Sequence, residues 1–304
     1  MKKIINLYDK EFGMNYSPLR YPGGKNKLYP LVKLMINRNN NDLTYIEPFV
    51  GGGGLALALL YNEDVKKIVI NDYDKAIYSV WRAILTETNK FIDLINKTPV
   101  TIEEWYHQRS IYLNKNKKYS LELGFATFFL NRTNRSGVLK AGPIGGYSQK
   151  GVYKIDCRYN KEQLIKKIID ISKNKNKIKL YNYDIRTFIK KIIPLYKNAF
   201  IYFDPPYFNK GKELYKNFFN KQDHEDIAAL IKSLKVNWMV TYDNSETIKE
   251  IYKEYDIKKY KVIYSLANTG ESEELIFTSS PLLWPSKKDL EAIKVKIEFT
   301  GETK

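Results

Sequence analysis

The stretch that decides the fold is Thr44–Tyr61, TYIEPFVGGGGLALALLY. Its first residues have the composition of a strand, four consecutive glycines follow, and Leu55–Tyr61 has the composition of a helix. Glycines at such a junction permit a tight turn and let a ligand approach the backbone closely. A strand, a glycine loop and a helix in this order are typical of an α/β fold with a ligand at the loop, although a simple packing turn would use the same residues.

The rest of the chain continues this alternation. Apolar runs in KKIVINDYD, KIKLYNYD, AFIYFDPPY and NWMVTYD predict further strands, and AIYSVWRAI and DHEDIAALIKSLK predict helices. The segment YKVIYSLANTGESEELIFTSS predicts a closing hairpin of two strands around a loop. The sequence therefore predicts a doubly wound, Rossmann-like α/β sheet, in which ligands bind at the carboxyl ends of the strands.

The segment between Ile84 and Lys179 interrupts the alternation. It begins with helical patterns and continues as FFLNRTNRSGVLKAGPIGGYSQKGVYKIDCRYN, in which glycines lie among aromatic and basic residues. We expect this part to form a β-hairpin or a loop excursion. The sequence therefore predicts a discontinuous domain of residues 1–83 and 180–304, into which a partly helical domain of residues 84–179 is inserted.

Basic residues concentrate in the same segment. The 304-residue chain has 51 Lys and Arg against 34 Asp and Glu, a formal net charge of +17. Residues 105–180 contain 17 Lys and Arg against 4 Asp and Glu, so 13 of the 17 net positive charges lie there. A compositional bias would spread this excess along the chain. Its concentration favours a polyanionic partner for the inserted segment.

Residue types also exclude several kinds of site. The single cysteine, Cys157, excludes an internal disulfide and a multi-cysteine metal site. The two histidines, His107 and His224, are far apart in sequence, and we expect no bound metal. The N-terminus MKKIINLYDKEFGMNY lacks a secretory apolar core, and no apolar run approaches transmembrane length. We therefore expect a soluble, cytoplasmic protein that does not bind membranes.

The segment NAFIYFDPPYF, Asn198–Phe208, carries the most informative chemistry. Its apolar run predicts a buried strand, which the two prolines must end because neither has an N–H for a strand ladder. The residue before a proline is held extended. The strand end therefore offers the Asp204 carboxylate and the Pro205 carbonyl as acceptors beside Tyr207, which suits a planar group that carries an NH2. The alternative is a strand-ending loop in which Asp-Pro-Pro arose by chance.

Two further motifs indicate a nucleotide-like cofactor. Asp72 follows the glycine loop by about twenty residues, at the end of the next predicted strand, where an acid can bind ribose hydroxyls. Gly51, Gly53 and Ala56 also satisfy the dinucleotide-binding pattern G-x-G-x-x-A. NAD is therefore the first alternative cofactor for this loop. In LRYPGGK, the turn before Lys25 exposes backbone N–H groups beside a cation, a suitable clamp for a carboxylate. S-adenosylmethionine has a carboxylate, whereas NAD has none.

The motifs LRYPGGK, YIEPFVGGGG, INDYD, YNYD, FIYFDPPYF, FFNKQDHEDIA and ESEELIFTS occur in the order found in Dam-type adenine-N6 DNA methyltransferases, which are α-class amino-methyltransferases. The chain resembles this family from Ser17 to Ser279. The resemblance implies a methyltransferase sheet with an inserted target-recognition domain, S-adenosyl-L-methionine as cofactor and double-stranded DNA as partner. The recognition segment departs from the family's GATC-reading pattern, so the recognition sequence stays open.

The resemblance also implies roles for individual residues. The implied cofactor-binding residues are Tyr21, Gly24, Lys25, Glu47, Phe49, Gly51, Gly53, Asp72, Asp184 and Asp204. The implied catalytic motif is Asp204, Pro205, Pro206 and Tyr207. As DNA contacts, to phosphates and to bases, we select Arg132, Asn134, Arg135 and Lys140.

The implied reaction explains why acceptors surround the end of this strand. An exocyclic adenine amine is a poor nucleophile because its lone pair is delocalised into the ring. Asp204 and the Pro205 carbonyl would bind its two N–H bonds, with Tyr207 stacked on the base, and the adenine must be flipped out of the duplex to reach them. We therefore predict methyl transfer from S-adenosylmethionine to the N6 amine of a flipped adenine in duplex DNA, accelerated by positioning and electrostatics.

Two other functions remain open. An enzyme with the same sheet could methylate RNA or a protein amide, because similar strand ends serve other planar NH2 groups. A non-enzymatic DNA-binding module would leave the cofactor motifs unexplained. The sequence does not reveal the oligomeric state, nor whether the enzyme acts alone or beside a separate restriction endonuclease in a restriction-modification system.

Overall fold

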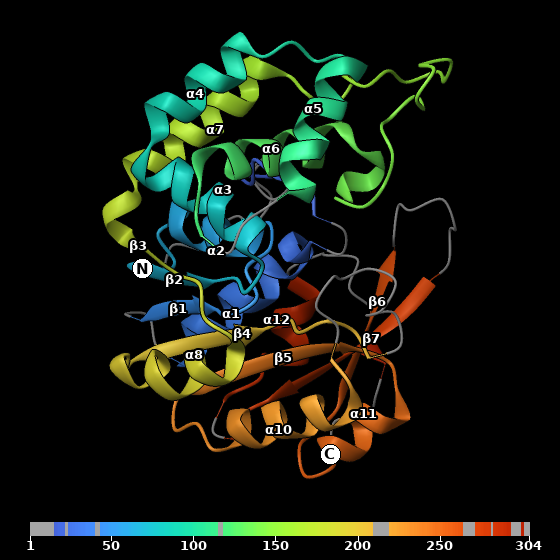
Figure 1. Ribbon diagram of the computed structural model, residues 1–304. Helices are drawn as coiled ribbons and strands as arrows, with labels where there is room; N and C mark the ends of the chain where they lie inside the picture. The colour runs from blue at the N-terminus through green and yellow to red at the C-terminus, as the bar shows by residue number, and fades with distance from the viewer. Residues whose placement is uncertain are drawn as a thin grey trace.

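The computed structural model shows an α/β protein built on one mixed sheet (Figure 1). It describes residues 15–21, 24–39, 43–114, 118–208, 219–263, 271–280, 282–292 and 299–300. The strands are β1 Thr44–Glu47, β2 Lys67–Asn71, β3 Ile178–Tyr181, β4 Ala199–Phe203, β5 Asn237–Asp243, β6 Lys258–Ile263, β7 Glu271–Thr278 and β8 Phe299–Thr300. They lie in the order β3-β2-β1-β4-β5-β7-β6-β8.

Strands β1 to β5 are parallel, and β7 lies antiparallel between β5 and β6. The register places Ile46 of β1 between Val69 of β2 and Ile201 of β4. All three side chains are fully buried, as expected for a parallel sheet that is covered on both faces. This arrangement confirms the predicted doubly wound α/β sheet and its closing antiparallel hairpin.

Helices cover both faces of the sheet (Figure 1). The described helices are η2 Lys25–Leu28, α1 Tyr29–Asn39, α2 Gly54–Tyr61, α3 Lys75–Thr86, α4 Thr88–Lys97, α5 Ile102–Leu113, α6 Leu121–Thr133, η3 Arg135–Gly137, α7 Lys161–Lys173, η4 Lys175–Lys177, α8 Ile185–Lys191, η5 Ile193–Leu195, α10 Lys221–Lys232, α11 Glu246–Ile251 and α12 Lys287–Ala292. Side chains alternate between the faces of a strand, so Tyr45 packs in one apolar core with α1, α2 and α3, and Ile46 packs in a second with α8, α10 and α11. No described helix is long and apolar enough to cross a membrane.

Helices α4 to α7 extend from α3 at the end of the molecule away from α10 (Figure 1). The FFLNRT part of the expected hairpin forms the end of α6. Residues 134–160, all of which are described, contain turns and one isolated bridge, Asn134 to Pro143, and no strand. Of the two expected forms, the β-hairpin is therefore wrong, and the segment is the loop excursion. Gly137 and Gly145 have φ values of 75° and 84°, which bend the chain away from the extended geometry that a ladder needs.

The predicted domain boundary at Ile84 lies inside α3, which ends at Thr86. Ile84 belongs to the same apolar core as Phe125 and Phe129 of α6. The helices of residues 84–179 therefore pack against the helices that cover the sheet through a shared core. The division into two domains stays a prediction.

Candidate active site

A glycine loop joins β1 to α2 at the carboxyl end of the sheet. The angle φ is 45° at Gly51 and 59° at Gly53, in the left-handed region that favours glycine. A Cβ at Gly53 would approach Cζ2 of Trp81 to 2.6 Å. Nε1 of Trp81 in turn donates a hydrogen bond of 3.0 Å to the Gly51 carbonyl. A side chain at Gly53 would therefore push the loop away from α3.

The N-terminal motif packs on this loop. The ring of Tyr21 covers Gly51, where an added Cβ would meet Cε1 of that ring at 2.7 Å. Oγ of Ser17 donates a hydrogen bond of 2.5 Å to the Gly52 carbonyl. The N–H of Gly24 donates to the Tyr21 carbonyl at 3.1 Å. Two segments that are about thirty residues apart in the chain thus form one wall of the site.

Asp72 follows β2 and supports the glycine loop. Its Oδ2 accepts a hydrogen bond of 3.0 Å from Gly51 N, and its Oδ1 accepts one of 2.9 Å from Asp74 N. These contacts therefore orient the Asp72 carboxylate beside the glycine loop.

A cleft of about 790 Å³ opens along the carboxyl ends of the strands. Its lining includes Tyr21, Gly24, Lys25, Glu47, Phe49, Gly51, Gly53, Asp72, Lys140, Asp184, Asp204 and Pro206. The structure thus brings all the residues that were predicted to bind the cofactor around one space. Their individual roles stay predictions.

Asp184 lies three residues beyond β3 and caps α8. Its Oδ1 accepts hydrogen bonds of 3.1 Å from the N–H groups of Arg186 and Thr187. Burial would raise the pKa of Asp184, but these hydrogen bonds and the charge of Arg186 hold it below its usual value. Asp184 is therefore an ionised helix cap at the edge of the cleft.

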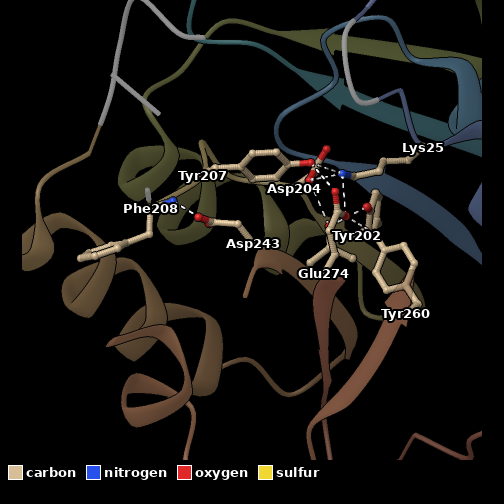
Figure 2. Close-up of polar contacts among 9 residues, drawn as sticks. Lys25, Tyr202, Asp204, Tyr207, Phe208, Asp243, Tyr260 and Glu274 are labelled. Atoms are coloured by element: carbon tan, nitrogen blue, oxygen red, sulfur yellow. Dashed lines mark hydrogen bonds and ion pairs between the residues drawn. The ribbon is translucent and has the colours of Figure 1, made fainter. Parts of the chain in front are cut away.

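The DPPY corner (Asp204–Tyr207) follows β4, and Lys25 of η2 and Glu274 of β7 lie beside Asp204 there (Figure 2). Oδ1 of Asp204 lies 3.2 Å from Nζ of Lys25 and accepts a hydrogen bond of 3.0 Å from Oγ1 of Thr241. The Asp204 side chain keeps 24% exposure and lines the cleft. Burial raises its pKa to about 6, although the charge of Lys25 acts in the opposite direction. At neutral pH the carboxylate is mostly ionised.

The ammonium of Lys25 is directed at this corner. Nζ lies 3.1 Å from Oε2 of Glu274 and donates a hydrogen bond of 2.8 Å to the Tyr207 hydroxyl, in addition to its contact with Asp204. Burial lowers the pKa of Lys25, but the two carboxylates outweigh this and hold it well above its ordinary value. Lys25, which was predicted to contact the cofactor, is thus a protonated lysine whose ammonium is bound to the carboxylates of Asp204 and Glu274.

Tyr207 is anchored at the same corner. Its hydroxyl donates a hydrogen bond of 2.6 Å to Oε1 of Glu274. The N–H of Phe208 donates one of 2.8 Å to Oδ1 of Asp243, which fixes the chain after the prolines, and Pro205 is buried. The end of β4 is therefore held rigidly on both sides of the prolines.

Glu47 ends β1, beside β4. Its side chain is buried, and Oε1 accepts a hydrogen bond of 2.8 Å from the Tyr45 hydroxyl. Burial raises the pKa of Glu47 to about 8, and the charge of Asp204 adds to this rise. At neutral pH Glu47 is therefore mostly protonated and can donate as well as accept a hydrogen bond.

The chain resembles a family of known proteins over most of its length. The family model for D12 class N6 adenine-specific DNA methyltransferases matches residues 21–266. The chain belongs to this family. A curated relative, the Type II methyltransferase M.MjaIII of Methanocaldococcus jannaschii, is 27% identical over 266 residues, which cover 79% of this chain and 89% of the relative. The predicted adenine-N6 DNA methyltransferase is confirmed.

Several solved structures show a low similarity to the methyltransferase. A SAM-dependent methyltransferase from Agrobacterium tumefaciens has 12% identity and a TM-score of 0.40, with 85% of this chain and 63% of that chain covered. TrmK of M. capricolum, in complex with S-adenosyl-homocysteine, has 9% identity and a TM-score of 0.36, with 82% and 67% covered. A conserved hypothetical protein from Streptococcus pyogenes has 14% identity and a TM-score of 0.35, with 83% and 95% covered.

Three of the four residues selected as DNA contacts reach the surface of the methyltransferase. Arg135 and Lys140 are exposed in the excursion after α6, and Lys140 lines the cleft. Arg132 is partly buried, and its Nε donates a hydrogen bond of 2.8 Å to the Arg158 carbonyl. Burial and the neighbouring arginines lower the pKa of Arg132 to about 10, so it remains a cation at neutral pH.

Asn134 does not reach the surface. Its Oδ1 accepts a hydrogen bond of 2.6 Å from Nε1 of Trp105, and its Nδ2 donates to the carbonyls of Val138 and Leu139 at 3.0 and 3.2 Å. The side chain is fully buried. The Asn134 amide therefore holds the fold of the excursion, and its selection as a DNA contact stays a prediction.

The DPPY corner of the methyltransferase also includes residues that the sequence did not single out. Thr241 and Glu274 bind its polar groups, and the Tyr260 hydroxyl donates to Glu274. An acid before the apolar residues LIF is the one local signal for Glu274. That signal is insufficient, because the register of β7 against β5 decides whether Glu273 or Glu274 points to the corner.

The described part of the chain contains no group of three or more His, Cys, Asp and Glu side chains that could hold a metal ion. Cys157 is exposed. His224 is buried, with Nδ1 at 2.9 Å from the Tyr242 hydroxyl, and burial lowers its pKa to about 4. His224 is therefore a neutral core residue.

Proposed function

We propose that this adenine-N6 DNA methyltransferase takes its methyl group from S-adenosyl-L-methionine and receives its target adenine flipped out of duplex DNA. When bound, S-adenosyl-L-methionine supplies an electrophilic methyl group on a positively charged sulfur. The observation that carries the proposal is the single cleft, which reaches from the glycine loop to Asp204. Cofactor at the loop and the target amine at Asp204 would lie in one continuous space.

The loop end of the cleft fits this cofactor chemically. Asp72 lines this end of the cleft, where an acid can bind ribose hydroxyls. Oδ1 of Asn26, which also lines the cleft, is buried without a hydrogen-bond partner in the described part of the chain. A buried acceptor of this kind requires a donor, and the ammonium of the methionine part would be one. The residues that would hold the cofactor are Tyr21, Gly24, Glu47, Phe49, Gly51, Gly53, Asp72 and Asp184.

The other end of the cleft fits an exocyclic amine. Lys25 and Thr241 both bind Oδ1 of Asp204. Oδ2 accepts no hydrogen bond from any described residue, so it is the oxygen that would accept from the target N–H. The Pro205 carbonyl would accept the second N–H. Two acceptors on one amine withdraw its lone pair from conjugation with the ring, which makes the nitrogen a better nucleophile.

The remaining contacts would orient the base and the DNA. The ring of Tyr207, fixed by its hydroxyl at Glu274, would form a wall of the adenine site. Lys140 and Arg135 lie exposed in the basic excursion, where they would bind phosphates or base edges. Unstacking a base costs a few kcal/mol, which contacts of this kind offset.

The test is methyl transfer from radiolabelled S-adenosylmethionine to duplex DNA, RNA and protein in parallel. We expect label in DNA alone, at the N6 position of adenine. Asp204→Ala should abolish transfer and leave DNA affinity, measured by calorimetry, close to wild type. Label in RNA or protein but not in DNA, or near-normal turnover of Asp204→Ala, would contradict the proposal.

A role in restriction-modification is also proposed, because the curated relative is a Type II methyltransferase. In such a system a separate endonuclease would cut the same sequence when it is unmethylated. A DNA substrate agrees with the predicted cytoplasmic location. Mapping N6-methyladenine in DNA from cells that express the protein would give the recognition sequence and the site that such a partner must share.

A further inference from the structure

Strand β7 brings a buried acid to the DPPY corner (Figure 2). Glu274 is 1% exposed and binds three donors. Its Oε1 accepts from the Tyr207 hydroxyl at 2.6 Å, and its Oε2 accepts from Nζ of Lys25 at 3.1 Å and from the Tyr260 hydroxyl. A carboxylate in the interior is unfavourable unless it is well paired. Its presence beside Asp204 therefore requires an explanation.

Neutralising Asp204 does not explain it. Lys25 alone would neutralise Asp204, whereas the observed arrangement sets one ammonium between two carboxylates, 3.2 Å from Asp204 and 3.1 Å from Glu274. When Glu274 is ionised like Asp204, the corner has one more negative than positive charge. With a single carboxylate, the Lys25 ammonium would pair fully with Asp204 and weaken it as a hydrogen-bond acceptor.

We propose that Glu274 is a positioning residue for methyl transfer, which shares the Lys25 ammonium with Asp204 and so keeps Asp204 available to the target amine. The proposal rests on the role proposed above for Asp204. Glu274 acts through Lys25 and does not itself contact the base. Its hydrogen bond with Tyr207 fixes the far end of the same corner, so one acid aligns both sides of the adenine site.

The charged groups around Asp204 predict how its titration responds. The groups that face it from neighbouring elements are Lys25 of η2, Tyr45 and Glu47 of β1, Tyr202 of β4, Tyr242 of β5, and Glu274 of β7. Apart from burial, the charge of Lys25 lowers the pKa of Asp204 and the charge of Glu274 raises it. Removing the charge of Glu274 should therefore shift the acid limb of the pH–rate profile to lower pH.

The test is Glu274→Gln, which keeps the shape and an oxygen acceptor but removes the charge. We expect kcat to fall about tenfold or more near neutral pH, and the affinities for S-adenosylmethionine and DNA to change by less than about threefold. The acid limb of kcat should move to lower pH. Glu273→Gln is the matched control, because Glu273 is the preceding residue of β7 and accepts a hydrogen bond of 3.0 Å from Asn244. This control should keep the wild-type pH profile.

A double-mutant cycle tests the route through Lys25. In a Lys25→Met background, Glu274→Gln should change kcat by less than about threefold, because the ammonium that it shares is absent. An undiminished effect in that background would overturn the proposal, as would a wild-type pH profile in Glu274→Gln. Glu274→Asp, which keeps the charge, should keep the acid limb at the wild-type pH even if Glu274→Gln folds poorly. Asp204→Ala distinguishes failure of the role of Glu274 from failure of the role of Asp204. Retained turnover in Asp204→Ala would refute the role of Asp204 itself.

Discussion

The side-chain amide of Asn131 binds both polar groups of the Arg20 main chain. Its Oδ1 accepts a hydrogen bond from Arg20 N and its Nδ2 donates one to Arg20 O, both at 2.7 Å. Nδ2 also donates to the Gly137 carbonyl at 3.0 Å. Asn131 belongs to α6, whereas the residue after Arg20 is Tyr21, which covers the glycine loop. The segment proposed to meet DNA and the loop proposed to hold the cofactor are thus joined at Asn131.

Asn131→Ala should therefore weaken both stability and cofactor binding. The substitution leaves buried polar groups without their partners, which should lower the free energy of unfolding by about 1–3 kcal/mol. Urea denaturation measures this change, and calorimetry measures the affinity for S-adenosylmethionine. Asn96→Ala, at an exposed position of α4, is the control and should have little effect on either. Unchanged cofactor affinity in Asn131→Ala would show that the two segments are not coupled.

Gly53→Ala should destabilise the glycine loop more than a positive φ alone explains. Gly53 has a φ of 59° and a Cβ there would meet Trp81 at 2.6 Å, whereas Gly146 has a φ of 77° with no atom within 4 Å of an added Cβ. Gly146→Ala thus measures the stability lost when a residue with a Cβ adopts a positive φ. In Gly53→Ala the clash with Trp81 should lower the free energy of unfolding by about 1–3 kcal/mol more. Equal losses in thermal unfolding would mean that the loop relaxes around the methyl group.

The turnover of the wild-type enzyme should rise with pH through about 6, because the pKa of Asp204 is raised to about 6 and the ionised carboxylate is the better acceptor. Single-turnover rates across this range measure the limb directly. Asp204→Asn keeps an oxygen acceptor that does not titrate. Its rate should be lower than that of the wild type and should no longer rise with pH through about 6. Persistence of the limb in Asp204→Asn would assign the titration to another group.

Glu47 should make the folded state less stable as pH rises. Its pKa is raised from 4.5 to about 8 in the folded protein. The stability that its proton contributes is therefore complete below the unfolded pKa and is lost as pH rises through about 8. Glu47→Gln has no titrating group at this position and cannot lose this contribution. The melting temperature of the variant should therefore rise relative to that of the wild type as pH increases. A constant difference between the two melting temperatures would contradict the assignment.

Lys140→Ala should weaken DNA binding equally on cognate and scrambled duplexes if Lys140 binds a phosphate. Each lost phosphate contact releases one counterion fewer, so the slope of log affinity against log salt should flatten by about one. Fluorescence titrations at several salt concentrations measure this slope. Lys190→Ala, on α8 across the sheet, removes the same charge as a control and should keep the wild-type slope.

Arg135→Ala should instead relax the preference at one position of the recognition sequence. A lost contact with a base edge costs about 1–3 kcal/mol on the cognate duplex and little on a scrambled one. The same titrations distinguish this outcome from the uniform loss expected for Lys140→Ala. Wild-type behaviour of both variants would move the DNA surface away from the excursion.

The sequence by itself determined the sheet, the glycine loop, the DPPY corner and the family. These features depend on local properties: apolar runs form buried strands, glycines tolerate positive φ, and prolines end a strand ladder. The carboxyl ends of neighbouring parallel strands must meet at one edge of the sheet. The sequence alone could therefore place the residues predicted to hold the cofactor, from Tyr21 to Asp204, at one cleft, and the structure shows them lining one.

Only the tertiary structure decided which groups meet inside that cleft. Lys25 was expected to clamp a cofactor carboxylate, and that role stays a prediction. The structure adds that its ammonium lies between Asp204 and a glutamate 249 residues away. Asn134 was expected at the DNA surface, and its amide is buried against Trp105. The register of an antiparallel strand and the packing of a helix determine these contacts. Such long-range pairings leave no periodic or compositional signal in the segments that they join.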